Sequence, residues 1–503
     1  MAQHHEVFGD RFLTVPLLVA ASVAMFLARE IIAGLAGLSD DEAYYRLWSM
    51  APALSFYDHP PMVAWLMAAG QLLAGDTVLG QRILAPVMLA AGAFLHWRST
   101  KILTNGHTAL IASWMFLAMP LLAVGGIIMT PDLPSVFFYG LVLYGLAELD
   151  RSQKANWWLA IGLFAGCGLL SKYTNLFAGI TILLWVLIVP RNRRWLACPQ
   201  FWLGGLIAVL VFCPVLIWNW QHDGASFAKQ FARAGRGQEF GVRYPLEMIG
   251  SLLGLASPII CALSSIGLID VMRRAWVTRD SRLVLLAAAG LPMLLYFCLH
   301  SLHDRVQANW LAPVYPVLAI YAAIGLTTVA PKLRRATAIG AIGFGIGSTT
   351  LIYAHAVAPI LQLPKDPAGQ LRGWAQFSQK IETLRLINGA QWVATSSYAT
   401  TGQLSFGLRH TVPVAQLNER IRHIHLPPVS HDLLAGPALY VELERRADKR
   451  LLASCFAEFR QTDTIRREDG TAAGAYYSVY IVSRPLVRCA AEMGVLRAAK
   501  ARL

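Results

Sequence analysis

The sequence predicts an α-helical polytopic membrane protein that carries a small α/β domain at its C-terminal end. The chain of 503 residues is 56% hydrophobic and only 14% charged, whereas soluble domains carry about 25% charged residues. Its mean hydropathy is positive, at +0.49. About eleven apolar runs are long enough to cross a membrane, and from about residue 370 the composition becomes that of a soluble domain.

The first apolar run, residues 12–33, is too long for the core of a cleavable signal peptide, so we expect a signal anchor. The run at 60–75 is apolar but too short to span, and we expect a re-entrant or interfacial helix there. Further spans are expected at residues 79–97, 107–128, 133–148, 156–171, 173–190, 201–218, 246–269, 283–300, 309–329 and 336–357.

Basic residues gather in every second connection between these spans, from Arg98 to Arg335. The positive-inside rule places those connections in the cytoplasm. The N-terminus is then cytoplasmic, and the first loop and everything after about Ala358 lie outside. We therefore expect a membrane domain over 1–358 and an outer soluble domain over 359–503. Because the topology explains much of the net charge of +14, we expect no nucleic-acid partner.

The soluble region has the pattern of a small α/β domain. A helix is expected over 372–387, followed by strands in QWVAT, ALYVELE and AYYSVYIV. Cys455 and Cys489 fall in this region, in a compartment that should be oxidising. They form either a disulfide or two unpaired thiols.

Three adjacent acids, Asp40, Asp41 and Glu42, follow the first span directly. Carboxylates beside the hydrocarbon boundary are costly to desolvate and usually mark function. Favourable charge at the start of the helix AYYRLW explains one of them. Three exceed what capping needs, so we expect a carboxylate that acts as a general base on an acceptor hydroxyl or holds a cation.

The turn YDHPPM follows in the same loop. His59 comes after Asp58 and before two prolines, which hold the chain in an extended turn. Its imidazole is either a hydrogen-bonded part of the turn or a donor to a phosphate.

Two further outer connections each carry one charged residue. Asp132 lies between prolines in MTPDLP, where it serves as a helix cap or in catalysis. Lys172 lies between two apolar runs in GLLSKYTN, where it either reaches the interface with its long stem or fixes an anionic head group.

One outer connection, residues 219–247, breaks the charge rule because it carries Lys229, Arg233, Arg236 and Arg243. An interfacial amphipathic helix explains these cations. The alternative is an anion site for a lipid phosphate.

The last outer loop, HSLHDRVQANW, gathers polar side chains within about ten residues. His300 and His303 have a spacing that permits metal ligation on a helix, but no clear third ligand accompanies them. We expect no metal site here and interpret the loop as the lining of a polar cavity. Acids, imidazoles and cations thus share one membrane face, as a site joining a lipid phosphate to a polar acceptor requires.

The first loop, in which Asp41, Glu42 and Tyr45 are spaced as DExxY before YDHPPMVAWL, resembles a known signature. It is similar to that of the membrane-embedded GT-C glycosyltransferases of the protein-mannosyltransferase and lipid A aminoarabinose-transferase type. The similarity covers most of the span region, including the TPD-like turn and a Gly-rich run that ends in lysine. It implies the GT-C fold and an inverting transfer of sugar from a polyprenyl-phosphate donor, on the periplasmic face of a bacterial inner membrane.

The resemblance also implies roles for individual residues. Asp41 matches the catalytic base, Glu42 its acidic neighbour and Asp132 the second-loop acid, while Lys172 matches the lysine near the donor phosphate. His59 departs from the pattern, because the aminoarabinose-transferase type has lysine in this turn. With an ordinary pKa near 6.5, the charge of a histidine here would depend on pH.

In the mechanism we expect, Asp41 deprotonates or orients the acceptor for in-line attack on the anomeric carbon. Cations then stabilise the departing lipid phosphate, so that neither a cofactor nor a divalent metal is required. The phosphate-binding residues would be Lys172, Arg243, His59 and Arg236. The substrate cavity would be lined by Asp40, Tyr45, Asp58, His303, Arg305 and Gln307.

The acceptor we expect is lipid A or the lipopolysaccharide core, with protein hydroxyls as the alternative. A polyprenyl-lipid flippase is the alternative from another class, but it should place polar groups near the bilayer midplane. A non-catalytic scaffold that displays the soluble domain leaves Asp41, Glu42 and Lys172 unexplained.

Overall fold

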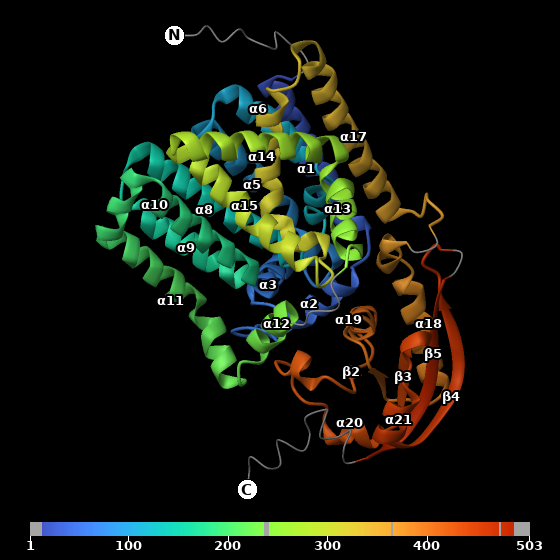
Figure 1. Ribbon diagram of the computed structural model, residues 1–503. Coiled ribbons are helices and arrows are strands. Elements are labelled where there is room, and N and C mark those ends of the chain that lie inside the picture. The colour runs from blue at the N-terminus through green and yellow to red at the C-terminus, as the bar shows by residue number, and fades with distance from the viewer. Residues whose placement is uncertain (1–12, 236–240, 364–365, 472–473, 487–503) are drawn as a thin grey trace. The chain divides into compact units, whose positions relative to one another are not determined.

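The computed structural model describes residues 13–235, 241–363, 366–471 and 474–486. Two compact units make up the chain (Figure 1). Unit 1 contains residues from 1–31, 58–63 and 82–352, and unit 2 contains residues from 32–57, 64–81 and 353–503. The first-loop acids thus group with the C-terminal region. The expected boundary at 358/359 between membrane and outer domains stays a prediction.

Unit 1 is helical. Four helices, α1 (Val15–Leu35), α3 (Met62–Ala74), α4 (Val78–Arg82) and α17 (Pro331–Val357), contribute residues to both units. The other elements of unit 1 are α5 (Leu84–Leu103), α6 (Gly106–Leu117), α7 (Pro120–Gly125), α8 (Asp132–Ser152), α9 (Trp157–Ser171), η1 (Tyr173–Asn175), α10 (Leu176–Ile188), η2 (Pro190–Ala197), α11 (Pro199–Gln221), α12 (Ala225–Gly235), α13 (Arg243–Ala256), α14 (Pro258–Thr278), α15 (Ser281–His300), η3 (Ala308–Val314) and α16 (Tyr315–Leu326).

Small residues bring the long helices of unit 1 together. Helices α8, α9 and α11 lie side by side (Figure 1). Gly162 of α9 packs directly against the backbone of Gly204 on α11, and a Cβ at either position would overlap the opposing helix. Gly267 and Gly325 allow the same close approach of α14 to α16. Such contacts are typical of helices that pack within a membrane.

Seven helices among the described residues are long and apolar enough to span a membrane, and the number rises to nine if two bent pairs each count as one span. Seven of the expected spans are therefore confirmed, and the total of eleven is not. The expected span at 156–171 is helix α9, whose 15 residues reach only about 22 Å, short of the roughly 30 Å of a hydrocarbon core. The confirmed spans are those expected at 12–33, 79–97, 133–148, 201–218, 283–300, 309–329 and 336–357.

Of the remaining expected spans, two are broken within their bounds and the third ends at a bend, and a proline lies at each of these points. At 107–128 the helix stops at Leu117 and restarts as α7 at Pro120. At 246–269 the chain turns by 106° between α13 and α14, where Ser257 has φ 79° and Pro258 begins the new helix. At 173–190 the chain bends by 113° where η2 starts at Pro190. Proline begins a helix readily but removes a hydrogen bond from the interior of one.

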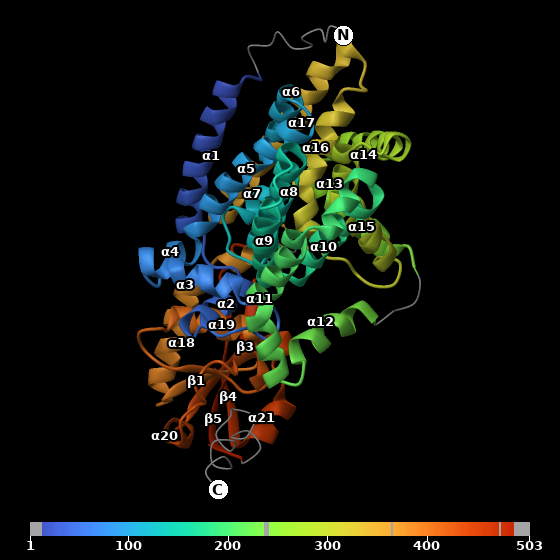
Figure 2. The same ribbon diagram turned by 90° about the vertical axis from the view of Figure 1, so that its left-hand side faces the viewer.

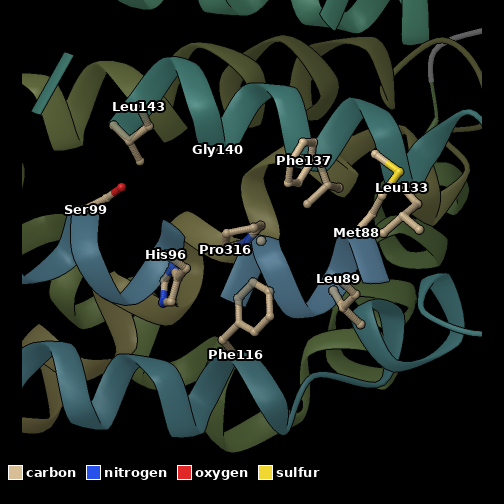
Figure 3. A pocket seen from close by; sticks show the side chains of 12 residues that line it. Met88, Leu89, His96, Ser99, Phe116, Leu133, Phe137, Gly140, Leu143 and Pro316 are labelled. Atoms are coloured by element: carbon tan, nitrogen blue, oxygen red, sulfur yellow. The ribbon is translucent and has the colours of Figure 1, made fainter. Parts of the chain in front are cut away.

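An apolar pocket lies inside unit 1 between α5, α6, α8 and α16 (Figure 3). The imidazole of His96 stacks on the ring of Phe116 at 4.9 Å between centroids, and Met88 and Leu133 lie at the other end. None of the sequence-predicted site residues is among those that line it. The pocket thus belongs to the packing of the span region.

Unit 2 is built on a five-stranded sheet of order β2-β1-β3-β5-β4. Strands β2, β1 and β3 are parallel, and β3, β5 and β4 are antiparallel. Its elements are α2 (Asp40–Met50), η4 (Pro367–Leu371), α18 (Trp374–Ile387), β1 (Trp392–Thr395), α19 (Tyr398–Gly407), β2 (Val414–Gln416), η5 (Arg420–His423), α20 (His431–Ala435), β3 (Ala438–Leu443), η6 (Glu444–Arg446), α21 (Lys449–Cys455), β4 (Phe456–Arg467) and β5 (Ala475–Pro485).

The expected helix and three strands of the soluble region correspond to α18, β1, β3 and β5. Helix α18 lies beside the sheet (Figure 2), with Phe377 and Trp392 in the core. Two strands have no counterpart in the sequence prediction. Strand β2 has only three residues, and β4 is a mostly exposed edge strand that lacks a continuous apolar run.

Candidate active site

Glu42, one of the three first-loop acids, caps the start of helix α2 together with Ser39. Ser39 is the N-cap residue, and its hydroxyl accepts a hydrogen bond from the Glu42 backbone N–H at 3.2 Å. The Glu42 carboxylate in turn accepts from the Ser39 backbone N–H at 3.0 Å and from its hydroxyl at 2.9 Å. This is a capping box. Glu42 is fully buried, so it is the acid that capping explains, and its catalytic role stays a prediction.

Asp40 is held by the C-terminal part of unit 2. Its carboxylate accepts a hydrogen bond from Gln403 Nε2 at 3.1 Å, and its backbone N–H donates to Gln370 Oε1 at 3.1 Å. Burial raises the pKa of Asp40, and the hydrogen bond from Gln403 and the charge of Arg467 oppose that shift. These contacts fix its carboxylate within unit 2, and its expected place in a substrate cavity stays a prediction.

Asp41 is the exposed acid of the three. Tyr398, at the start of α19, lies close enough to Asp41 for the charge of this carboxylate to act on its hydroxyl. Burial raises the pKa of Tyr398 to about 12, and the charges of Asp41 and Asp40 add to the shift. Tyr398 therefore stays protonated and keeps its O–H donor. An exposed carboxylate in the first turn of a helix, with a hydroxyl nearby, has the chemistry of a general base.

Tyr45 lies on α2 and is buried, with its ring 4.7 Å from that of Trp48. Trp48 itself stacks on Phe56 at 4.4 Å. The expected place of Tyr45 in a substrate cavity stays a prediction, because the described contacts of its ring are those of an aromatic core.

Helix α2 is fixed to α19 and to the segment after β2. A Cβ at Gly402 would come within 2.6 Å of the backbone of Ala43, so only glycine permits this approach. Gln403 Nε2 also donates to the Leu38 carbonyl at 2.9 Å. Buried Arg46 pairs with Asp76, and its Nε–Oδ1 distance is 2.7 Å. The acid-bearing helix thus has defined supports within unit 2.

In unit 1, Asp132 and Lys172 form an ion pair with 2.5 Å between Lys172 Nζ and Asp132 Oδ1. Asn309, at the start of η3, donates from Nδ2 to the second carboxylate oxygen at 2.9 Å, and its carbonyl lies 3.4 Å from Lys172 Nζ. Asp132 opens α8, and Lys172 ends α9 in an extended conformation. The structure brings together three residues from connections that the sequence treated separately.

The turn with Asp58 and His59 is tied to α12. Lys229 pairs with the Asp58 carboxylate, and Gln230 Nε2 donates to the Asp58 carbonyl at 2.6 Å. Asp58 is buried and His59 is half-buried. Lys229 is one of the cations of the basic outer connection, and its charge is balanced by Asp58 within unit 1.

Helix α12 also holds the turn that carries Lys172. The Ser226 hydroxyl lies 2.8 Å from the hydroxyl of Tyr173, the residue after Lys172. The rings of Tyr173 and Phe227 lie 5.7 Å apart. One amphipathic helix in unit 1 thus contacts both the Asp58 turn and the Lys172 turn.

Arg243 and Arg305 share one acidic partner. Glu247 accepts a hydrogen bond from Arg243 Nε at 2.9 Å, and its other carboxylate oxygen forms an ion pair with Arg305 Nε at 3.0 Å. Both guanidinium groups are exposed, as are His303 and Gln307 in the same loop. The triad leaves a net positive charge on this surface of unit 1, which is compatible with the expected contact to an anion.

Two predicted residues lie outside the described part of the chain, namely Arg236 and Cys489. Cys455 is buried in the core of unit 2. Because Cys489 lies outside the described residues, the disulfide between the two stays a prediction. Within the described ranges, no three His, Cys, Asp or Glu side chains come together as a metal-binding group.

Sequence reasoning missed Tyr398 and Asn309 as partners of the predicted acids. Asn309 was interpreted only as part of a polar loop. Tyr398 follows a small-residue turn in the soluble region, and nothing in SSYATT points to an acid in the first loop.

The fold of the chain is similar to that of the membrane-embedded GT-C glycosyltransferases. The family model described as dolichyl-phosphate-mannose-protein mannosyltransferase matches residues 58–218. Among solved structures, ArnT from Cupriavidus metallidurans bound to undecaprenyl phosphate superposes with a TM-score of 0.66, covering 92% of this chain and 97% of that one at 13% identity. The resemblance expected from the first loop is confirmed.

Curated relatives cover much of the chain, and three of them are 23% to 26% identical to it. The lipid A galacturonosyltransferase RgtD of Rhizobium johnstonii is 26% identical over 73% of this chain and 77% of its own length. The lipopolysaccharide core galacturonosyltransferase RgtA of the same organism is 23% identical over 61% and 63%. An undecaprenyl phosphate-alpha-4-amino-4-deoxy-L-arabinose arabinosyl transferase of Erwinia tasmaniensis is 25% identical over 58% and 54%.

Proposed function

We propose that this protein is an inverting glycosyltransferase that moves a sugar from a polyprenyl-phosphate donor to lipid A or the lipopolysaccharide core. The observation that supports this proposal is how the contacts and exposure of the three first-loop acids differ. Glu42 is engaged in the helix cap and Asp40 in the contact with Gln403, while Asp41 is exposed with a hydroxyl donor beside it. Asp41 is therefore the carboxylate we assign as base.

The reaction we propose is a single displacement. Asp41 accepts the proton of the acceptor hydroxyl, or orients an acceptor that is already ionised, as the acceptor oxygen attacks the anomeric carbon. The bond between that carbon and the donor phosphate breaks, and the electron pair leaves with the phosphate. One displacement inverts the configuration, and no covalent intermediate forms.

Lys172 is the cation we assign to the departing phosphate. Because Asp132 already pairs with Lys172, and Asn309 orients Asp132, the ammonium is positioned before the donor binds. Positioned charge stabilises a developing anion without reorganisation at the moment of reaction. Arg243, Arg305 and His59 are further candidates for contacts with the donor.

The sugar we propose is a uronic acid. RgtD is named a lipid A galacturonosyltransferase and covers 73% of this chain, against 58% for the aminoarabinose transferase of Erwinia tasmaniensis and 62% for that of Pseudomonas paraeruginosa. A 4-amino-4-deoxy-arabinose is the second candidate. We place the enzyme in a bacterial inner membrane with Asp41 on the periplasmic face, because the basic connections then lie in the cytoplasm.

Mass spectrometry of cells that produce the wild type or Asp41→Asn at equal level tests this function. Lipid A, core oligosaccharide and envelope proteins are compared, with Asp463→Asn, an exposed acid on β4, as the matched control. We expect a uronate-sized mass on lipid A or the core to disappear only in Asp41→Asn. A sugar lost from envelope proteins would indicate a protein acceptor, and identical spectra would contradict the assignment of Asp41.

We further propose that turnover needs no divalent ion, because fixed cations serve the leaving phosphate. Purified enzyme treated with a chelator should keep full activity. Activity that is lost and returns only with added metal would disprove this part of the proposal.

A further inference from the structure

Helix α19 begins at the carboxyl end of strand β1 and is anchored there by a buried carboxylate. Glu442, at the end of β3, has no exposed surface. It accepts hydrogen bonds from the hydroxyl of Ser397, the N-cap of α19, at 3.0 Å and from the hydroxyl of Thr400 at 2.8 Å. It also accepts from the Ser396 backbone N–H at 3.1 Å. A buried carboxylate with this many donors fixes the start of α19 on the sheet.

The next residue, Tyr398, lies close enough to Asp41 for the charge of that carboxylate to act on its hydroxyl. Its ring lies 5.0 Å from that of Tyr44 on α2, and the guanidinium of Arg422 lies 5.2 Å from its centroid. Arg422 in turn pairs with Glu419 at 2.9 Å. The ring is thus held on two sides, and its hydroxyl has a fixed direction.

We propose that Tyr398 is a positioning residue for Asp41, so that the C-terminal sheet supplies the support of the catalytic base. The inference rests on the proposed function, in which Asp41 is the base. Helices α2 and α19 approach closely at Gly402, which lies one turn after Tyr398 on the same helix. The sheet, through Glu442 and α19, therefore sets both the distance and the direction of the hydroxyl.

In this role the Tyr398 hydroxyl donates to Asp41 and favours its ionised form, because a donor stabilises a carboxylate. It also fixes the carboxylate rotamer that faces the acceptor. The other charged or titratable groups around the pair are Asp40 and Tyr44 of α2, Arg422 and Glu419 of the η5 segment, and Glu442 of β3.

Steady-state kinetics of Tyr398→Phe tests the proposal, because this variant keeps the ring and removes only the hydroxyl. Tyr480→Phe is the matched control, since its buried hydroxyl donates to Gln461 Oε1 at 3.2 Å elsewhere in the same sheet. In Tyr398→Phe we expect kcat to fall about tenfold to a hundredfold, as for a lost hydrogen bond to a charged group. KM for the donor should change less than about twofold.

The pH profile separates positioning from a structural role. The acid limb of kcat/KM should move to higher pH by about one unit in Tyr398→Phe, and it should stay in place in Tyr480→Phe. The midpoint of this limb does not depend on how much of the sample is folded. A wild-type kcat and pH profile in Tyr398→Phe would overturn the inference.

Asp41→Asn, measured in parallel, keeps the two proposals apart. If Asp41→Asn is inactive while Tyr398→Phe behaves like the wild type, only the role of Tyr398 fails. If Asp41→Asn keeps full turnover, the assignment of the base fails, and with it the proposed mechanism.

Discussion

Lys172 and Asp132 form a mostly buried ion pair, with 10% and 17% of their side chains exposed. Two charges taken out of water depend on each other, and removal of one leaves the other uncompensated. A donor phosphate that binds Lys172 must therefore compete with Asp132 or join it. Changing either residue of the pair therefore tests whether the donor phosphate binds at Lys172.

For Asp132→Asn we predict a lower melting temperature without ligand, because Lys172 loses its counter-charge. Undecaprenyl phosphate should restore stability by a larger shift than in the wild type, since the phosphate replaces the lost carboxylate. Thermal unfolding in detergent, with and without the lipid, measures both effects. Lys172→Ala should lose the shift, and equal shifts in all three proteins would argue against phosphate binding at Lys172.

Two imidazoles that support α2 are kept neutral by their surroundings. Burial lowers the pKa of His423 to about 3 and that of His425 to about 4. His423 Nε2 lies 2.9 Å from Gln416 Oε1, and His425 Nε2 lies 3.3 Å from the Leu47 carbonyl on α2. A proton added to either ring would bring a charge into a buried site.

We predict that this segment loosens in mild acid. The folded-state pKa of each ring lies below the unfolded value of 6.5, so the unfolded chain takes up protons first as the pH falls. Stability is therefore complete above about pH 6.5 and is lost as the pH falls toward the folded pKa. Between pH 6.5 and 5 the free energy of unfolding should fall by about 1.5 kcal/mol for each ring.

Thermal unfolding across this pH range measures the effect, with His425→Phe as the test variant. Phenylalanine keeps the ring contact with Phe56, which lies 5.0 Å away, and removes the titration. The variant should show about half of the acid sensitivity that the pair contributes. An unchanged pH dependence would contradict the assignment to these rings.

At the scale of elements, the contact of α2 with α19 decides where the acids lie. It combines a close backbone approach at Gly402 with hydrogen bonds from Gln403 to the Leu38 carbonyl and to Asp40. Because Tyr398 begins the same helix, a shift of α19 moves the hydroxyl away from Asp41.

We predict that Gly402→Ala separates the two helices. Its methyl group would lie 2.6 Å and 2.7 Å from backbone atoms of Ala43 and Tyr44, and overpacking of this kind costs about 1–3 kcal/mol. Gly343→Ala is the control, because a Cβ there meets nothing within 4 Å. Melting temperature and turnover should both fall in Gly402→Ala only, and a variant as active and stable as the control would contradict the close approach.

At the scale of the whole molecule, the number of spans bears on the sides of the two termini. The described helices support seven spans, or nine with both bent pairs, and the sequence predicts eleven. All three numbers are odd, so each places the N-terminus and the C-terminal region on opposite sides. With the eleven spans that the sequence predicts, the positive-inside rule predicts that the C-terminal region lies outside.

Fusions to alkaline phosphatase, which is active only outside the cytoplasm, test this topology. We predict activity for a fusion after Pro485 and none for a fusion after Arg279, which follows the basic end of α14. A fluorescent protein that matures only in the cytoplasm should give the reverse pattern. Phosphatase activity after Arg279 would overturn the orientation.

Composition and local pattern account for most of the elements, because they depend on residues close together in the chain. Apolar length predicted eleven spans, of which seven are confirmed, and the acids before AYYRLW predicted the helix that begins at Asp40. Proline often begins a new helix, so the breaks at Pro120, Pro190 and Pro258 could have been predicted from the sequence. Strand β4 could not have been predicted, because an exposed edge strand needs no apolar pattern.

The sequence by itself determined the membrane class, the resemblance to GT-C glycosyltransferases and the candidate acids and cations. Only the tertiary structure decided which acid is exposed and which distant partners the candidate acids and cations have. Glu42 could be paired with Ser39 by spacing, but Asp132 meets Lys172 and Asn309, and Asp41 meets Tyr398, only through packing. A hydrogen bond between distant residues depends on how their helices and strands approach, and no local spacing carries that information.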